Sequence, residues 1–201
     1  ARYLPYAIAG SNHEFVLHKT KSIYCYSLLE PDYNWLNRFS FSSLFEATGT
    51  ENIRAWTLDS IKEIKDVSFD IIKTDTQGLE LPILSAGRKF LNDAFYVETE
   101  TGFVENYRHE TTFAQIEDFV RENHFLLFDI NTDHRVSRNN PLGQYASNEQ
   151  ILWCEATWLK DYIALYRSGK ITAGSLTREK ALKCLILCAL QGCYSYGYEL
   201  A

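Results

Sequence analysis

Several common sequence features are missing from this chain of 201 residues. Glycine and proline are scarce, at 10 and 4 residues, which argues against a disordered or low-complexity chain. The five cysteines form no CxxC pair, so the sequence favours free thiols in a reducing compartment over a zinc or dithiol site. The longest strongly apolar run, residues 184–190, is far shorter than the roughly 20 residues that cross a bilayer. With no basic-then-apolar leader in view, we expect a cytoplasmic protein without a membrane span.

Positive charge and methionine are also in short supply. The chain has 20 Lys and Arg against 26 Asp and Glu, a net charge of −6, and no basic stripe, so nucleic acid is not an expected partner. Methionine is absent, and the chain opens directly on an apolar segment at residues 3–9. We therefore expect it to be the C-terminal part of a longer protein. Its 46% hydrophobic content is enough for one globular core.

Hydrophobic periodicity predicts an α/β fold. Runs of apolar and β-branched residues predict strands at residues 4–9, 14–18, 52–56, 69–75, 95–100, 125–130 and 151–158. Helical spacing predicts helices at 58–65, 79–91 and 113–123, the last starting at a capping box of Thr112 and Gln115. Irregular structure is expected at 22–45, and a long polar loop at 131–149. This alternation predicts a mostly parallel sheet covered by helices on both faces.

The C-terminal residues 161–201 have a different pattern, that of a helical extension. Apolar residues recur there with helical spacing and are expected to face the core: Leu182, Leu185, Ile186, Ala189 and Leu190. A second short helix is expected after Gly192. Cys184 and Cys188 lie one turn apart beside this stripe, a spacing that suits a metal pair but more often belongs to core thiols.

Acidic residues follow two of the predicted strands. Asp75 ends one strand just before Gly78, and Glu98 and Glu100, two residues apart, project from the same face of the next. In open parallel sheets, ligands bind beyond the carboxyl ends of the strands, so these positions are candidates for a site. The structural alternative is a set of ion pairs with Lys73.

Other candidates come from loops. A loop base is conceivable at His109, Asp133 and His134, although loop histidines are more often solvated. Aromatic rings pack against sugar faces as well as inside protein cores. A sugar site and buried packing are therefore the two alternatives for a further group of aromatic residues: Tyr24, Tyr26, Tyr33 and Trp35.

Four blocks in a fixed order carry a family resemblance. They are TLDS at 57–60, the segment 70–87 with KTDTQGLE at 73–80, YVETE at 96–100, and residues 113–130. Together they resemble the FkbM-type methyltransferase family over about residues 1–160. The resemblance implies a class I, Rossmann-like methyltransferase fold that binds S-adenosylmethionine and methylates an oxygen. Acceptors in such families include sugars, lipids and polyketides.

The resemblance also implies site residues. Asp75 and Gln77 would lie between the methionine end of the cofactor and the acceptor, with Glu98 at the neighbouring strand end, and one of these carboxylates would act as general base. Ala7 and Ile8 would border the adenine, and Asp75 would also contact the cofactor. The reaction requires no metal, although Asp75, Glu98 and Glu100 could together hold a divalent cation.

The chain departs from the family pattern in two ways. Gln77 stands where the family has Glu, and the glycine-rich cofactor loop and ribose-binding acid of the first two strands have no match. The sequence therefore predicts an incomplete methyltransferase domain at 1–160 that binds S-adenosylmethionine weakly or not at all on its own. In the sheet order that the resemblance implies, residues 4–9 and 71–75 would lie three strand spacings apart, roughly 14 Å, with an unfilled gap between them instead of direct pairing.

The function expected is O-methylation of a small-molecule or glycan acceptor. The alternative is a non-catalytic α/β interaction module that uses its helical tail as a contact surface. A glycine-rich strand–turn–helix ahead of Ala1 would favour the enzyme. Neither the acceptor nor the oligomeric state follows from the sequence.

Overall fold

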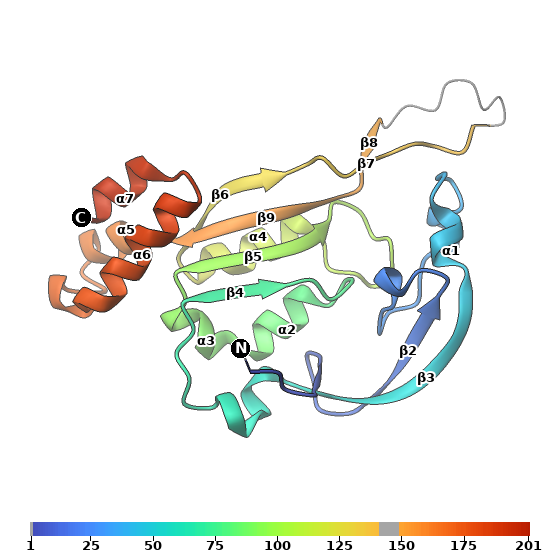
Figure 1. Cartoon of the computed structure of the whole chain (residues 1–201), viewed down its shortest axis with the longest axis horizontal. Coiled ribbons are helices and arrows are strands. Elements are labelled where there is room, and N and C mark those ends of the chain that lie inside the picture. Colours follow the sequence, from blue (N-terminus) through green and yellow to red (C-terminus); the bar gives the residue numbers. More distant parts are fainter. Residues whose placement is uncertain (1, 141–148) are drawn as a thin grey trace.

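The computed structural model describes residues 2–140 and 149–201, and its centre is a four-stranded sheet (Figure 1). The strands are hydrogen-bonded in the order β4 (Ile71–Thr74), β5 (Tyr96–Gly102), β9 (Trp153–Lys160) and β6 (Phe125–Asn131). The pair β4–β5 is parallel, and β9 runs antiparallel to both of its neighbours. The carboxyl ends of β4 and β5 point toward α1 (Tyr33–Leu36) and β2 (Glu14–Thr20).

The prediction of a mostly parallel sheet is wrong, because the sheet is mixed. Strands β4, β5 and β6 share one direction, and β9 is inserted between β5 and β6 in the opposite direction. The chain from β6 to β9 contains no crossover helix in its described part; it forms the short hairpin β7 (Arg135–Val136) and β8 (Gln150–Ile151). A connection without a crossover returns the chain antiparallel. Part of the predicted polar loop, residues 141–148, lies outside the described residues.

Helices cover one face of this sheet along its length and the other face only at one end, so the expectation of cover on both faces holds in part. The helices on the first face are α2 (Glu80–Ala86), α3 (Arg88–Asp93) and α4 (Phe113–Glu122). Their apolar sides pack on inward-facing strand residues such as Val97, Ala156 and Trp158, all fully buried. On the opposite face the C-terminal helices pack on Tyr96 and Leu159, and polar side chains that are partly exposed follow beyond that end.

A second, three-stranded sheet is built from the first part of the chain. Its order is β1 (Ala7–Ile8), β3 (Ala47–Trp56) and β2, with β1 parallel and β2 antiparallel to β3. The predicted first strand is cut to two residues, in keeping with the proline at its start. Residues 4–9 do not pair with residues 71–75, because β1 pairs with β3 whereas β4 pairs with β5. The expectation of a gap between them within one sheet is wrong, since β1 and β4 belong to different sheets.

Helix α4 begins and ends as predicted, with the Thr112 amide donating to Gln115 Oε1 at 2.8 Å. Two other predicted helices are interrupted. Residues 58–65 form two 3-10 turns, Leu58–Ser60 and Lys62–Ile64, and the helix expected at 79–91 breaks at Gly87. A Cβ on Gly87 would lie 2.7 Å from Leu58 Cδ1, so the side chain of Leu58 packs where the helix breaks. Segment 22–45 is irregular as predicted, with 3-10 turns at Ile23–Cys25 and Ser42–Phe45 around α1.

The C-terminal residues fold into α5 (Tyr162–Arg167), a 3-10 turn (Ala173–Ser175), α6 (Arg178–Leu190) and α7 (Tyr194–Leu200), which cover one end of the sheet (Figure 1). The predicted apolar stripe is not the buried one, since Ile186 and Leu190 of α6 are 50% and 75% exposed. Cys184 and Cys188 are buried instead, as core thiols, against Phe95, Tyr96 and Leu159. Gly197 of α7 packs so closely on Cys188 that only a very small residue fits at this position. Within the described residues, no helix is long and apolar enough to cross a membrane.

Candidate active site

The turn between β4 and α2 is held together by a buried carboxylate. Glu80, 1% exposed, accepts hydrogen bonds from the Thr76 amide at 2.7 Å, the Thr76 hydroxyl at 2.9 Å and the Gly78 amide at 3.1 Å. Burial raises the pKa of this carboxyl, and the donors of the turn partly offset that effect. Glu80 therefore shapes the turn, and its carboxyl oxygens accept hydrogen bonds from the turn itself.

Gln77 occupies an unusual backbone conformation in this turn. Its φ is 55°, in the left-handed region that a non-glycine residue enters at a cost of about 1 kcal/mol. The Ser27 hydroxyl donates to the Gln77 carbonyl at 2.6 Å and stabilises it there. Gly78 follows at φ 105°, and a Cβ on it would lie 2.9 Å from Leu29. The turn thus directs the side chain of Gln77 toward a cavity.

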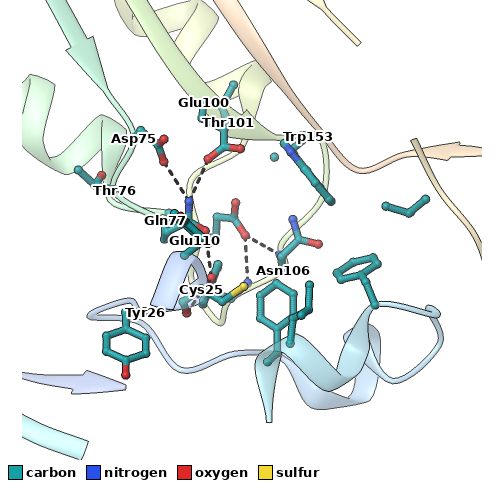
Figure 2. A pocket seen from close by; sticks show the side chains of 18 of the residues that line it. Cys25, Tyr26, Asp75, Thr76, Gln77, Glu100, Thr101, Asn106, Glu110 and Trp153 are labelled. Carbon is teal, nitrogen blue, oxygen red and sulfur yellow. Dashed lines mark hydrogen bonds between the residues drawn. The ribbon is translucent and has the colours of Figure 1, made fainter. Parts of the chain in front are cut away.

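The side chain of Gln77 bridges two carboxyl groups (Figure 2). Its Nε2 donates to Asp75 Oδ1 at 3.0 Å and to Glu100 Oε2 at 2.9 Å. Its Oε1 accepts a hydrogen bond from the Tyr107 hydroxyl at 3.1 Å, and the same hydroxyl lies 3.1 Å from the Cys25 carbonyl. We call the four side chains of Asp75, Gln77, Glu100 and Tyr107 the carboxyl clamp.

Two carboxyls so near each other do not ionise independently. Burial, followed by the neighbouring Asp75 carboxylate, raises the pKa of Glu100 to about 8, and the bond from Gln77 only partly opposes this. Burial also raises the pKa of Tyr107 far above its usual range, so its hydroxyl remains a donor. The clamp therefore holds a proton near neutral pH.

The clamp lies on the wall of a cavity of about 700 Å³. Aromatic residues from the irregular segment before β3 and from the start of β9 form much of the remaining wall: Tyr24, Tyr26, Phe41, Phe45 and Trp153. Glu110 lines it too; burial raises its pKa to about 7, although it accepts hydrogen bonds from the Asn106 and Tyr107 amides at 2.5 and 3.0 Å. Arg135 is the only Lys, Arg or His among the described lining residues, so the cavity is mostly acidic and aromatic.

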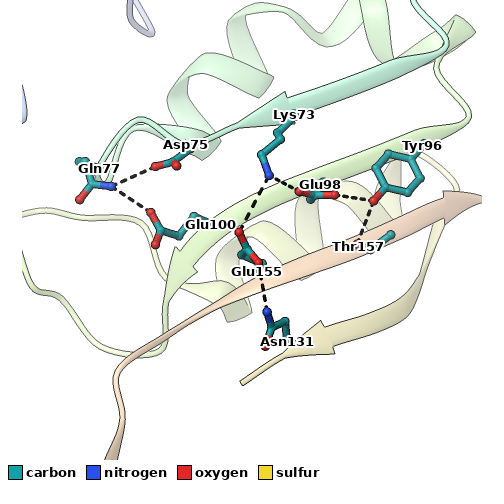
Figure 3. A network of polar contacts seen from close by, with 9 residues as sticks. All are labelled: Lys73, Asp75, Gln77, Tyr96, Glu98, Glu100, Asn131, Glu155 and Thr157. Atoms are coloured by element: carbon teal, nitrogen blue, oxygen red, sulfur yellow. Dashed lines mark hydrogen bonds and ion pairs between the residues drawn. The ribbon is translucent and has the colours of Figure 1, made fainter. Parts of the chain in front are cut away.

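The structure places Glu98 apart from this cavity (Figure 3). Glu98 lies opposite Lys73 in the β4–β5 register, forms a short ion pair with it, and accepts a hydrogen bond from the Tyr96 hydroxyl. Burial opposes ionisation of Glu98, but these two partners outweigh it and lower its pKa. The structural reading of a Lys73 ion pair therefore describes Glu98, whereas Glu100, one strand repeat further on, reaches the cavity with Asp75.

The three positions expected to contact the cofactor do not lie together. Asp75 is exposed at the cavity, whereas Ala7 and Ile8 are half-buried in β1 and do not line it. The chain after β1 nevertheless returns to the same turn, since a Cβ on Gly10 would lie 2.8 Å from Pro82 Cβ in the first turn of α2. The end of β1 is thus next to the start of α2.

The loop histidines stay outside the cavity. His134 stacks on Trp153 with ring centroids 5.8 Å apart, and neither His109 nor Asp133 is among the lining residues. Of the aromatics that suggested a sugar site, Tyr24 and Tyr26 line the cavity, whereas Tyr33 and Trp35 pack in a neighbouring apolar cluster. Within the described ranges, no three His, Cys, Asp or Glu side chains are grouped as a metal site requires.

Sequence reasoning missed most of the cavity wall. Tyr107 and Glu110 follow β5 in an irregular segment without periodicity, and Phe41 and Phe45 come from the equally irregular segment before β3. The sequence singles out Glu100 as an acid near a strand end but gives it no chemical role except that of a metal ligand. The available clue was its two-residue spacing from Glu98, which places both on one face but does not say which of them reaches the strand end.

An acid-lined cavity beyond the carboxyl ends of two parallel strands suits a small-molecule enzyme, and comparison with known families narrows the class to the methyltransferases. Residues 3–127, more than half of the chain, match the family model described as the methyltransferase FkbM domain. The chain belongs to this family, which confirms the resemblance read from its sequence. Comparison with curated proteins and with solved structures finds no match.

Proposed function

We propose that this protein is a cytoplasmic O-methyltransferase that uses S-adenosylmethionine and takes its acceptor hydroxyl into the cavity beside the carboxyl clamp. The observation that carries the proposal is the meeting of Asp75, Gln77 and Glu100 at the end of β4 and β5, in a chain that belongs to a methyltransferase family. We assign the methyltransferase part to residues 1–160, with an incomplete Rossmann-like sheet, and treat residues 161–201 as a helical extension.

The residues at the cavity fit the charge of the proposed cofactor. S-adenosylmethionine supplies an activated methyl group on a positively charged sulfur. The exposed Asp75 carboxylate, in a cavity with one lining cation, suits that charge. Ala7 and Ile8 would border the adenine from β1, whose end reaches α2 through the Gly10–Pro82 contact.

The chain's contribution to the reaction is position and proton transfer. Carboxyl groups at the cavity orient the acceptor hydroxyl and accept its proton as the oxygen is methylated. Gln77 holds Asp75 and Glu100 in place. Glu98 takes no part in this proposal because its carboxylate is paired with Lys73 outside the cavity.

The lining indicates an uncharged acceptor with a flat or apolar body. Phe41, Phe45 and Trp153 offer ring faces, against which sugar rings and aromatic metabolites both pack. Anionic acceptors would meet the carboxyls of Asp75 and Glu100, and among the described lining residues only Arg135 would offset them. A sugar, lipid or secondary-metabolite hydroxyl remains the proposed target.

The test follows a labelled methyl group. The protein at its natural length would be incubated with S-adenosylmethionine carrying a ¹³C-methyl group and a small-molecule extract, and the products would be examined by mass spectrometry. We expect a labelled methyl ether from the wild-type protein and a much weaker signal from Asp75→Asn. Label on nitrogen or carbon would contradict O-methylation, and no transfer to any acceptor would contradict the proposed function.

One observation favours the non-catalytic alternative, an interaction module. Large apolar side chains are exposed along α6 and α7: Leu182, Ile186, Leu190, Tyr194 and Tyr198. Such a surface is typical of a contact with another protein. If the protein transfers no methyl group but associates through this surface, substitution of Ile186 and Leu190 by serine would abolish the association, and the module would replace the enzyme as the conclusion.

A further inference from the structure

We propose that Glu100 is the catalytic base of this methyltransferase, and that Gln77 is a positioning residue which holds Glu100 and Asp75 together in an orientation set by Tyr107. This inference rests on the proposed function and extends it, because the sequence pattern points to Asp75 and Glu98 and assigns Glu100 no proton transfer.

The hydrogen bonds of the clamp leave Gln77 one orientation. Both carboxyl oxygens, Asp75 Oδ1 at 3.0 Å and Glu100 Oε2 at 2.9 Å, require donors, so the NH₂ end of the amide faces them. The carbonyl end then faces the Tyr107 hydroxyl, which donates at 3.1 Å. A glutamate at position 77 would instead present a third carboxylate. Gln77 thus allows the carboxyl groups of Asp75 and Glu100 to lie close together, because its amide donates a hydrogen bond to each.

The surroundings of Glu100 separate it from Glu98. Glu98 is held by the ammonium of Lys73 and the hydroxyl of Tyr96, so it is a poor base. The titratable groups that act most strongly on Glu100 are the acids Asp75 and Glu80, and a third acid, Glu155, lies opposite it in the β5–β9 register. Arg135 lines the same cavity, but no ion pair with Glu100 is formed among the described residues. Glu100 is therefore the more basic of the two carboxyls and the one that lines the cavity.

The proton-transfer step balances as follows. The oxygen–hydrogen bond of the acceptor breaks, and its proton passes to the ionised carboxylate of Glu100. The oxygen forms a bond to the methyl carbon, and the electron pair of the carbon–sulfur bond leaves with the sulfur, which becomes a neutral thioether. Glu100 afterwards returns its proton to solvent at the open side of the cavity.

The first test measures the titration midpoint of Glu100 in the absence of any ligand. The 201-residue chain would be labelled with ¹³C at the glutamate side-chain carboxyls and titrated by NMR, and the Glu100→Gln variant would identify the resonance. We expect a midpoint near 8 for Glu100. Asp75→Asn removes the neighbouring charge and should lower that midpoint, whereas Gln77→Met removes the donor and should raise it. Glu122→Gln, on α4 and paired with Arg88 outside the cavity, is the control and should leave it unchanged.

The second test uses methyl transfer from S-adenosylmethionine by the protein at natural length, measured against pH. Turnover should rise toward a plateau above about pH 8, fall on the order of 10²-fold in Glu100→Gln, and follow the shift that Asp75→Asn causes in the NMR midpoint. Tyr107→Phe frees the amide of Gln77 to turn, so it should lower kcat more than it raises KM.

Each outcome bears on a different claim. A Glu100 midpoint in the ordinary carboxyl range near 4.3, or variants of Asp75 and Gln77 that shift it in the same direction, would overturn the clamp. Full turnover in Glu100→Gln together with lost turnover in Glu98→Gln would return the base to Glu98. If the midpoint is near 8 but the wild-type protein transfers no methyl group, the proposed function itself fails, and the catalytic role of Glu100 fails with it.

Discussion

The two ends of the four-stranded sheet handle buried charge in opposite ways. At the end covered by the C-terminal helices, Lys160 donates to the Leu91 and Asn92 carbonyls, and Lys180 pairs with Asp70 and the Asp93 carbonyl. These lysines satisfy the last carbonyls of α3 and attach α6 to the start of β4. At the other end, Asp75 and Glu100 share one amide donor and no cation.

The difference separates structural charge from functional charge. A charge that serves the fold is given an opposite charge or a set of carbonyls, which offsets part of the cost of its burial; burial still lowers the pKa of Lys160 to about 8. Burial, together with the neighbouring acids, raises the pKa of Glu100 and Glu110 and makes the folded state less stable at high pH. Proteins retain such unfavourable arrangements where they bind or react. Substituting a charged residue at each end of the sheet tests this difference.

The largest effect is expected at the covered end, from Lys160→Met. Lys160 is 5% exposed, and its loss leaves two carbonyls at the end of α3 without their donor, while the methionine keeps most of the apolar stem. Each unpaired buried carbonyl costs roughly 1–3 kcal/mol, so we expect unfolding free energy to fall by about 3 kcal/mol in urea titrations. Lys21→Met, at an exposed surface pair, is the control and should change it by less than about 0.5 kcal/mol.

At the cavity end, removal of charge should stabilise the protein. An unfolded glutamate ionises near 4.3, whereas Glu100 keeps its proton to about 8, so between these values the folded state binds the extra proton and stability falls as pH rises. Glu100→Gln should remove this fall, so the variant should be more stable than wild type at pH 8 and should gain less at pH 5. Thermal denaturation at pH 5 and pH 8 measures it; a variant no more stable than wild type at pH 8 would contradict the comparison.

Some of the fold could be predicted because local physics determined it. The capping box at Thr112 and the glycine turn after β4 each act within a few residues, so both are visible in sequence. The reversed strand β9 and the partial cover of the second face of the sheet depend on which distant segments meet. Periodicity describes one segment at a time and contains no information about its neighbours.

The third prediction concerns the opposite pH range at the covered end. Burial opposes ionisation of Asp70, but the ammonium groups of Lys180 and Lys183 outweigh it and lower its pKa. This stability is present above the unfolded carboxyl pKa near 3.9 and is lost as pH falls through the folded value. Asp70→Asn should cost about 1 kcal/mol at pH 7 and almost nothing at pH 2, in denaturant titrations at both values. A loss of equal size at both would contradict an ionic origin.

The candidate site shows the same limit of sequence reasoning at a finer scale. Asp75 and Gln77 belong to one contiguous turn, and the pattern located both. The choice between Glu98 and Glu100 depended on the register that sets Lys73 opposite Glu98, and Tyr107 enters the clamp from an irregular loop. Contacts of that kind are fixed by tertiary packing.

The smallest effect is expected on the outer side of the covered end. If the exposed stripe of α6 contributes nothing to the core, Leu190→Ser should change the unfolding free energy by less than about 0.5 kcal/mol, since Leu190 is 75% exposed. Cys184→Ser buries a hydroxyl among Phe95 and Leu159 at a 1% exposed position and should cost about 1–2 kcal/mol. Urea titrations of the two variants rank the faces of α6. A larger loss from Leu190→Ser would mean that the exposed stripe of α6 is covered in solution. It would then form a second contact surface beside the covered end of the sheet.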